Sequence, residues 1–191
     1  MFEQNNILRT AVDTLKVSRN FIFFAVGVYI VAAVAGWEYS DDLNFLEEQF
    51  HELAQRFEKL SPIAFVFRIF MHNLLASYLA MCFVTLFGLV PLALAMFNGL
   101  MVGWFAGWLE HVSWFGLAVF LVPHGIFEWP AMFIAFGVGM WRGMAHFFGS
   151  VDQSWGQLWK KANCVYFVFV VPLLFVAAVI EGRYHFMQMF S

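Results

Sequence analysis

The run "IAFVFRIFMHNLLASYLAMCFVTLFGLVPLALAMFNGLMVGWFAGWL", residues 63–109, decides the fold class. It is 47 residues long and holds one charged residue, Arg68. About 20 apolar residues cross a bilayer as a helix, so the run is too long for one crossing and long enough for two. Gly88 and Pro91 allow a tight turn near its middle. The run therefore predicts transmembrane helices at 63–87 and 91–109.

The composition of the whole chain points the same way. Of its 191 residues, 62% are hydrophobic and 12% are charged, and the mean hydropathy is +0.75. Soluble domains are nearer half apolar and a quarter charged, and a chain this short has too little interior to bury so many apolar side chains. The apolar runs are helical in scale, unlike the alternating strands of an outer-membrane barrel. We expect an all-α, polytopic transmembrane bundle that forms a single membrane domain over residues 1–191.

The net charge argues against nucleic acid as a partner, and the cysteines give no sign of redox chemistry. The net charge is −3 and no basic patch is present, so membrane lipid is the expected partner and nucleic acid is not. Cys82 and Cys164 both lie in apolar runs, where a thiol acts as a small hydrophobic group. No C-x-x-C motif occurs, so the cysteines do not report a redox compartment.

Three further segments complete the predicted spans. Residues 21–37 form the first apolar run and are expected to stay in the membrane as a signal anchor rather than to be cleaved. Residues 125–148 and 164–182 are each long enough to cross. Pro172 is expected to bend the last span.

Three segments are expected outside the full spans. Residues 1–19 are predicted to form a cytoplasmic amphipathic helix. Residues 41–60 carry apolar side chains at alternating spacings of three and four, which predicts an amphipathic helix on the membrane surface or against a partner subunit. Residues 114–123 are too short to cross, so we expect a re-entrant half-helix that Pro123 ends, with the next helix starting at that proline.

Basic residues orient the predicted bundle. The cations that precede the first and last spans are Arg9, Lys16, Arg19, Lys160 and Lys161. Lys and Arg are enriched in cytoplasmic loops, and both groups fall on one side of five crossings and one re-entrant segment. The N-terminus is then expected in the cytoplasm and the C-terminus outside, in a cytoplasmic (inner) membrane.

Small residues recur every fourth position in two of the spans. One stripe is Gly99, Gly103 and Gly107, and the other is Ala131, Ala135, Gly139 and Gly143. Stripes without side-chain bulk let helix backbones approach closely in lipid. We expect both to be helix contacts, either inside one subunit or between the subunits of a homodimer or larger homo-oligomer.

Several polar side chains interrupt the apolar spans. They are His72, Asn73, Asn98, His124, Glu128, Arg142 and Glu181. An Asp, Lys or Arg at the middle of a membrane helix costs about 2.5–3.5 kcal/mol on the insertion scale, so ionisable groups there face the bundle interior. His124 and Glu128 are four residues apart and point to one side of a helix. A helix start near Pro123 would also aim its free N–H groups at that side.

Three interpretations of these residues remain open. In the first, His124 and Glu128 form a hydrogen-bonded clasp with Asn73 and Asn98 that is purely structural. In the second, two imidazoles and two carboxylates bind a divalent metal such as zinc; the ligands would be His72, His124, Glu128 and Glu181. In the third, the polar set is a gate or relay for an ion or small solute.

The same residues carry a family resemblance. "LVPHGIFEWPAMFIAFGVG" (121–139) resembles the signature of the stage II sporulation protein M family of polytopic membrane proteins. "HNLLASYLA" (72–80) and "FNGLMVG" (97–103) resemble its asparagine motifs, and "AAVIEGRY" (177–184) resembles its final Ala-x-x-Ile-Glu motif. The motifs occur in the family's order, and the resemblance covers residues 63–185.

The resemblance implies which polar positions matter most. The family's characteristic polar positions fall on Asn73, Asn98, His124, Gly125, Glu128 and Glu181. His72 departs from the pattern, because the family usually has a small polar residue there, often asparagine. The family's namesakes belong to a complex that works with cell-wall remodelling enzymes during engulfment of the forespore. Relatives also occur in organisms that never sporulate, so that role is not carried over.

We expect a non-catalytic membrane component, a scaffold or part of a transport complex, whose partners include other membrane or cell-envelope proteins. The resemblance brings no agreed catalytic activity, and the polar residues show no nucleophile–base pattern. The alternatives are an intramembrane metal-dependent hydrolase, in which Glu128 acts as base or ligand, and a channel or transporter.

Overall fold

The computed structural model of the chain describes residues 2–43, 47, 60–82, 87–110, 114–145 and 153–189. Every regular element in these ranges is helical, which confirms the all-α prediction. The elements are α1 (Phe2–Glu38), η1 (Asp41–Leu43), α3 (Pro62–Cys82), α4 (Leu89–Glu110), α5 (Trp114–Met144), α6 (Trp155–Val165), η2 (Tyr166–Val170) and α7 (Val171–Met189). Within the described residues, four stretches are long and apolar enough to cross a membrane: Asn6–Glu38, Pro62–Cys82, Leu89–Trp108 and Trp155–Arg183.

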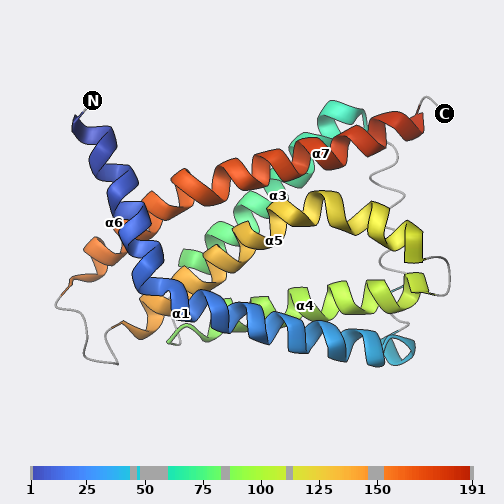
Figure 1. The fold of residues 1–191 in the computed structure, drawn as a ribbon, viewed down its shortest axis with the longest axis horizontal. Helices are drawn as coiled ribbons and strands as arrows, with labels where there is room; N and C mark the ends of the chain where they lie inside the picture. The colour runs from blue at the N-terminus through green and yellow to red at the C-terminus, as the bar shows by residue number, and fades with distance from the viewer. Residues whose placement is uncertain are drawn as a thin grey trace.

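The long helices run in alternating directions along the bundle (Figure 1). α1, α4 and the continuous α6–η2–α7 rod run one way, and α3 and α5 run back. The C-terminal ends of α1, α4 and α7 therefore gather with the N-terminal ends of α3 and α5 at one end of the molecule. This is the arrangement that repeated crossings of a membrane produce.

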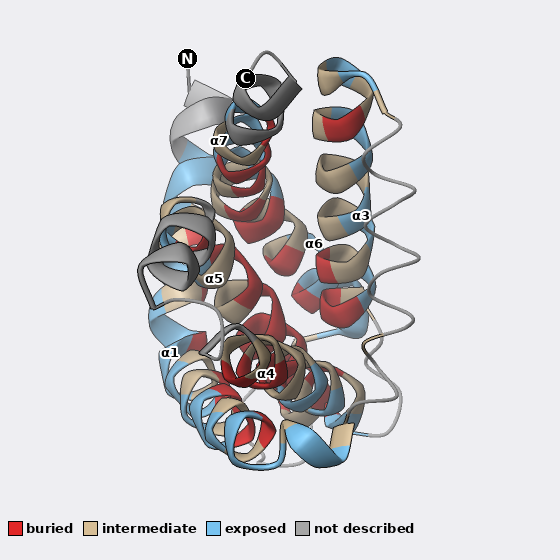
Figure 2. Cartoon of the chain, turned by 90° about the vertical axis from the view of Figure 1, so that its right-hand side faces the viewer, coloured by how far each residue is buried: buried red, intermediate tan, exposed pale blue. Residues whose placement is uncertain are grey.

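α5 is the central helix and contacts α1, α3, α4, α6 and α7. Its second half is almost wholly buried, and Ala131, Ala135 and Phe136 have no exposed surface. Figure 2 shows buried residues on the inward sides of the helices and exposed ones on the outside. Many exposed side chains are large and apolar, such as Phe23 at 71% and Ile63 at 84%. An outer surface of that kind suits contact with lipid.

α1 is one continuous helix, so the segments predicted over 1–19 and 21–37 are joined without a break. The polar residues near position 19 are not helix breakers, and Ser18 is instead buried within the helix. The helix changes direction in its first half (Figure 1). There, the Thr14 hydroxyl donates to the Thr10 carbonyl oxygen at 2.7 Å and the Ser18 hydroxyl donates to the Thr14 carbonyl oxygen at 2.9 Å. Such back-bonding bends helices.

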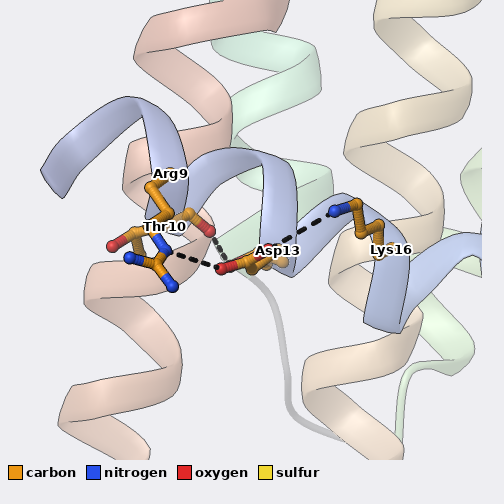
Figure 3. A network of polar contacts seen from close by, with 5 residues as sticks. Arg9, Thr10, Asp13 and Lys16 are labelled. Carbon is orange, nitrogen blue, oxygen red and sulfur yellow. Dashed lines mark hydrogen bonds and ion pairs between the residues drawn. The ribbon is translucent and has the colours of Figure 1, made fainter. Parts of the chain in front are cut away.

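The N-terminal part of α1 has one exposed charged face and one face packed on α6. Asp13 lies 3.9 Å from Arg9 and 3.7 Å from Lys16 (Figure 3). These ion pairs are exposed and contribute at most about 1 kcal/mol each. Ala11 and Thr14 are buried on the other face, and α1 contacts α6. Burial of that face, rather than the ion pairs, holds the segment to the bundle.

α5 continues through both of its prolines, so the predicted helix break at Pro123 is wrong. A proline inside a helix removes one backbone hydrogen bond and bends the helix, and membrane helices tolerate it because neighbours satisfy the freed carbonyl. α5 accordingly curves along its length (Figure 1). The predicted half-helix over 114–123 and the span over 125–148 are parts of one helix, which extends to Met144 in the described residues.

The turn predicted near Gly88 is present between α3 and α4. Phe87 and Gly88 have φ angles of 58° and 82°, in the left-handed region that favours glycine. A Cβ atom at Gly88 would also lie 3.0 Å from Cα of Met140, so only glycine fits both the backbone and the space. The third span starts at Leu89 rather than 91. In the described residues α3 runs to Cys82, and the predicted end of the second span at residue 87 falls in the turn.

The last rod begins earlier than the predicted start at 164. Ser154 caps α6 through a capping box with Gln157, which fixes the helix start at Trp155. The rod then passes through one π-helical turn, η2, just before Pro172. A π turn widens the helix and frees backbone groups at a point where proline cannot donate. Most of the predicted surface helix over 41–60 lies outside the described residues, which include only its start at η1 and residues 47 and 60.

The two stripes of small residues face other helices of the same chain. At Gly103 an added Cβ would collide with the carbonyl group of Ala33 in α1, and at Gly107 it would lie 2.6 Å from the Ser40 hydroxyl oxygen. Gly99 likewise meets the Tyr29 carbonyl oxygen. The first stripe therefore brings α4 against α1.

The second stripe lies on the buried side of α5. A Cβ at Gly139 would lie 2.6 Å from the Ala80 carbonyl oxygen near the end of α3, and one at Gly143 would meet the backbone of Gly88. Ala131 and Ala135 continue the stripe and are fully buried. Larger side chains at these positions would push α5 away from α3 and α4.

Candidate functional site

Asn73 and Glu128 form the best-defined contact among the predicted polar residues. The Asn73 amide on α3 lies close enough to the Glu128 carboxylate on α5 to donate a hydrogen bond to it. Both side chains are half-buried. Each lies well inside its helix, on the side that faces the other helix.

Glu181 brings a second carboxylate to Glu128. It lies on α7, is half-buried, and is close enough to Glu128 for their charges to interact. Contacts of α7 with both α3 and α5 hold the three helices together around this point. Two like charges at a membrane site repel each other and are poorly solvated. The pair therefore favours a proton or a cation between them.

Tyr29 is a further member of the site that sequence reasoning missed. It comes from α1, is 7% exposed, and stacks edge-on against Phe133 of α5 with ring centroids 5.0 Å apart. Its hydroxyl interacts electrostatically with Glu128 and has no hydrogen-bond partner among the described residues. The available signal was weak: Tyr29 is the only side chain with a hydroxyl between Phe21 and Gly36.

Two predicted members are not brought to the carboxylate pair. His72 is exposed, although its neighbour Asn73 faces α5. The Asn98 amide donates to the Leu94 carbonyl oxygen of its own helix at 2.8 Å. Among the described residues, no group of three or more His, Cys, Asp and Glu side chains is placed to hold a metal ion. The structure therefore does not place His72 beside the two glutamates.

His124 lies on α5 one helical turn before Glu128, but its side chain is outside the described part of the structure. Gly125 follows it and is buried, and a Cβ there would lie 3.1 Å from the Trp129 ring. The spacing of four residues puts positions 124 and 128 on one side of α5. The imidazole stays a predicted, rather than an observed, member of the site.

Arg142 belongs to a different part of the molecule. It lies 14 residues after Glu128 on α5, about 21 Å along the helix at 1.5 Å per residue. Its side chain is 4% exposed and donates from Nη1 to the Met81 carbonyl oxygen at 2.9 Å. That carbonyl lies in the last described turn of α3, which runs to Cys82 in the described residues. Arg142 thus ties α5 to that turn of α3.

A second polar network ties α3 to the last rod near the same end. The Tyr166 hydroxyl donates to the Leu74 carbonyl oxygen at 2.5 Å and lies 3.3 Å from the Ser77 hydroxyl. The Tyr78 hydroxyl donates to Oδ1 of Asn163 at 3.2 Å. The Tyr78 and Tyr166 rings meet edge to face, 4.9 Å apart. These bonds join α3 to α6 and η2.

The site that the geometry defines is a pair of carboxylates on neighbouring helices, one of them beside an amide, with a tyrosine hydroxyl close by. Its groups can bind a proton or a cation. These features, together with the apolar helices, define a polytopic α-helical membrane protein with a polar site inside the bundle.

Comparison with known proteins identifies the family. The family model described as "Stage II sporulation protein M" matches residues 20–184. The chain therefore belongs to the stage II sporulation protein M family. Comparisons with curated proteins and with solved structures gave no match.

Proposed function

We propose that this protein is a non-catalytic membrane component, a scaffold or a subunit of a transport complex, whose Glu128–Glu181 site binds a divalent cation. The observation that carries the proposal is the approach of these two carboxylates from α5 and α7. Within the described residues, the site offers carboxyl, amide and hydroxyl groups and no nucleophile paired with a base. Ligand binding suits that set of groups better than group transfer.

The energetics favour a bound cation. A carboxylate inside a membrane costs several kcal/mol unless it is paired, and a second carboxylate beside it adds repulsion. A divalent cation between Glu128 and Glu181 would offset both penalties. Carboxylate and amide oxygens are ligands of hard cations such as Ca²⁺ and Mg²⁺. An imidazole from His124, one turn before Glu128, would instead favour zinc.

The distribution of charge supports the proposed orientation. Arg9, Lys16 and Lys160 lie on the N-terminal part of α1 and on α6, which contact each other at one end of the bundle (Figure 1). Asp41 and Asp42 follow α1 near its opposite end. By the positive-inside tendency, the first end is cytoplasmic and the C-terminus lies outside. We propose the cytoplasmic (inner) membrane as the location and a homo-oligomer as the assembled state.

Metal binding tests the proposal directly. Purified protein in nanodiscs would be loaded separately with Zn²⁺, Ca²⁺, Mg²⁺ and Mn²⁺, washed, and assayed for bound metal by elemental analysis. We expect about one ion per site in the wild type and a loss of at least tenfold in affinity in E128Q and in E181Q. The matched control is E38Q, because Glu38 is an exposed carboxylate at the end of α1.

Two results would contradict the proposal. One is the absence of stoichiometric binding of all four ions to folded wild-type protein. The other is an equal loss of binding in E38Q and E128Q, which would place the ion at an exposed acidic surface.

A further inference from the structure

An apolar groove of about 410 Å³ runs between α3 and α7 on the outside of the bundle. α3 lines it from Pro62 to Phe70, and α7 lines it from Phe175 to Arg183. Among the described residues that line it, Arg183 is the only charged one. The groove lies between two helices that are apolar enough to cross a membrane, so its open side faces lipid.

The length of the groove matches one leaflet of a bilayer. The lining residues cover nine positions on each helix, which at 1.5 Å per residue is about 12 Å. Half of a hydrocarbon core is about 15 Å thick. The groove therefore extends from the membrane interface, where α3 begins, to near the middle of the bilayer.

The groove has a closed end, a floor and a charged mouth. At the inner end, the rings of Phe70 and Phe175 meet edge to face with centroids 5.7 Å apart. At the floor, the helices come so close that a Cβ on Gly182 would collide with Val66. At the mouth stands Arg183, which is exposed. The walls are exposed apolar side chains such as Phe67 at 63% and Val179 at 47%.

We propose that this groove is a binding site for one acyl chain of an anionic phospholipid, whose headgroup pairs with Arg183. The apolar walls match the chain, the depth matches one leaflet, and the cation stands where the headgroup would lie. A membrane helix is a poorer fit. It is about 10–12 Å across with its side chains, so a 12 Å length occupies on the order of 1,000 Å³ and would lie over the groove instead of filling it.

Lipid retention tests the site. Wild-type protein would be reconstituted in nanodiscs of equal phosphatidylglycerol and phosphatidylcholine, extracted, and analysed by native mass spectrometry for bound lipid. We expect phosphatidylglycerol to be retained in preference. R183Q should reduce that preference about fivefold, the effect of one basic residue near an anionic headgroup. V179W, which fills the groove with an indole, should abolish retention of either lipid.

Each variant has a matched control. V176W places the same indole on an exposed α7 position outside the groove, and R19Q removes an exposed cation from the other end of the bundle. Both should retain lipid as the wild type does, with unchanged circular dichroism. R183Q changes only an exposed side chain, so it tests the site even if V179W fails to fold.

Three outcomes would overturn the inference. They are equal retention of the two lipids by the wild type, equal effects of R183Q and R19Q, and full retention by V179W. A lipid-free wild-type dimer that V179W dissociates would also overturn it, because the groove would then be an interface between two copies of the chain.

Discussion

Asn73 of α3 and Glu128 of α5 meet across their helix interface, where the amide of the first lies close enough to the carboxylate of the second to donate a hydrogen bond. The residue before Asn73 has the opposite environment, because His72 is exposed on the outside of α3. Two adjacent polar residues of one helix therefore differ in role. One is joined to the candidate site, and the other faces outward.

Asn73→Leu should destabilise the protein by about 1.5–3 kcal/mol, the range for hydrogen bonds to charged groups. Leucine is similar in size but leaves the Glu128 carboxylate without its donor. The measurement is thermal or denaturant unfolding in detergent micelles. His72→Leu is the matched control and should stay within about 0.5 kcal/mol of the wild type, as exposed substitutions usually do. Equal losses in the two variants would show that the hydrogen bond does not stabilise the fold.

The composition of the candidate site could be predicted in part from the sequence. Asn73, Glu128 and Glu181 stand out because polar groups in apolar spans are expensive, and the structure brings these three together. The free-energy penalty of a polar group in a membrane span picks out these residues, but it does not give the rotation of each helix about its axis. Rotation decides that Asn98 bonds to its own α4 carbonyl and that Tyr29 turns toward Glu128.

Arg142→Met should lower stability by about 1.5–3 kcal/mol, because the Met81 carbonyl at the end of α3 would lose a charged donor. Methionine keeps most of the aliphatic volume, so the effect isolates the guanidinium. Unfolding of the purified protein would again measure it. Arg19→Met, at an exposed position of α1, should change stability by no more than about 0.5 kcal/mol. A more stable R142M protein would mean that the desolvation penalty of the buried cation exceeds the stabilisation from its hydrogen bond.

Gly103→Ala should destabilise the α1–α4 contact by about 1–3 kcal/mol, the usual effect of overpacking. The added methyl group would collide with the Ala33 carbonyl group. Gly27→Ala is the control on the same pair of helices, because nothing lies within 4 Å of a Cβ there. It should be neutral or stabilising by up to about 1 kcal/mol, since alanine favours helix. Melting temperatures that fall equally in both variants would contradict the close packing at Gly103.

The fold was predictable at the level of helices but not of their limits. Hydropathy locates apolar segments, and the glycine–proline pair near position 88 marks a turn that the structure contains. Hydropathy does not reveal that α1 runs through the charged segment before residue 21, because those residues favour helix even outside a membrane. Nor does hydropathy reveal that α5 passes through Pro123, because membrane helices tolerate a proline when neighbouring groups satisfy the freed carbonyl.

Ser77 and Tyr166 should show a measurable coupling, because their hydroxyl groups lie 3.3 Å apart between α3 and η2 in a buried position. A double-mutant cycle with S77A, Y166F and the combined variant would isolate it. Hydrogen bonds between membrane helices average about 0.6 kcal/mol and reach about 1.7 kcal/mol, so a coupling free energy in that range is expected. Y166F alone should destabilise the protein by more than the coupling, since the hydroxyl also donates to the Leu74 carbonyl oxygen.

Tyr39→Phe, at a residue that is 59% exposed, is the control and should leave stability unchanged within about 0.5 kcal/mol. A coupling of zero with a full loss in Y166F would assign the stabilisation to the bond with Leu74 alone.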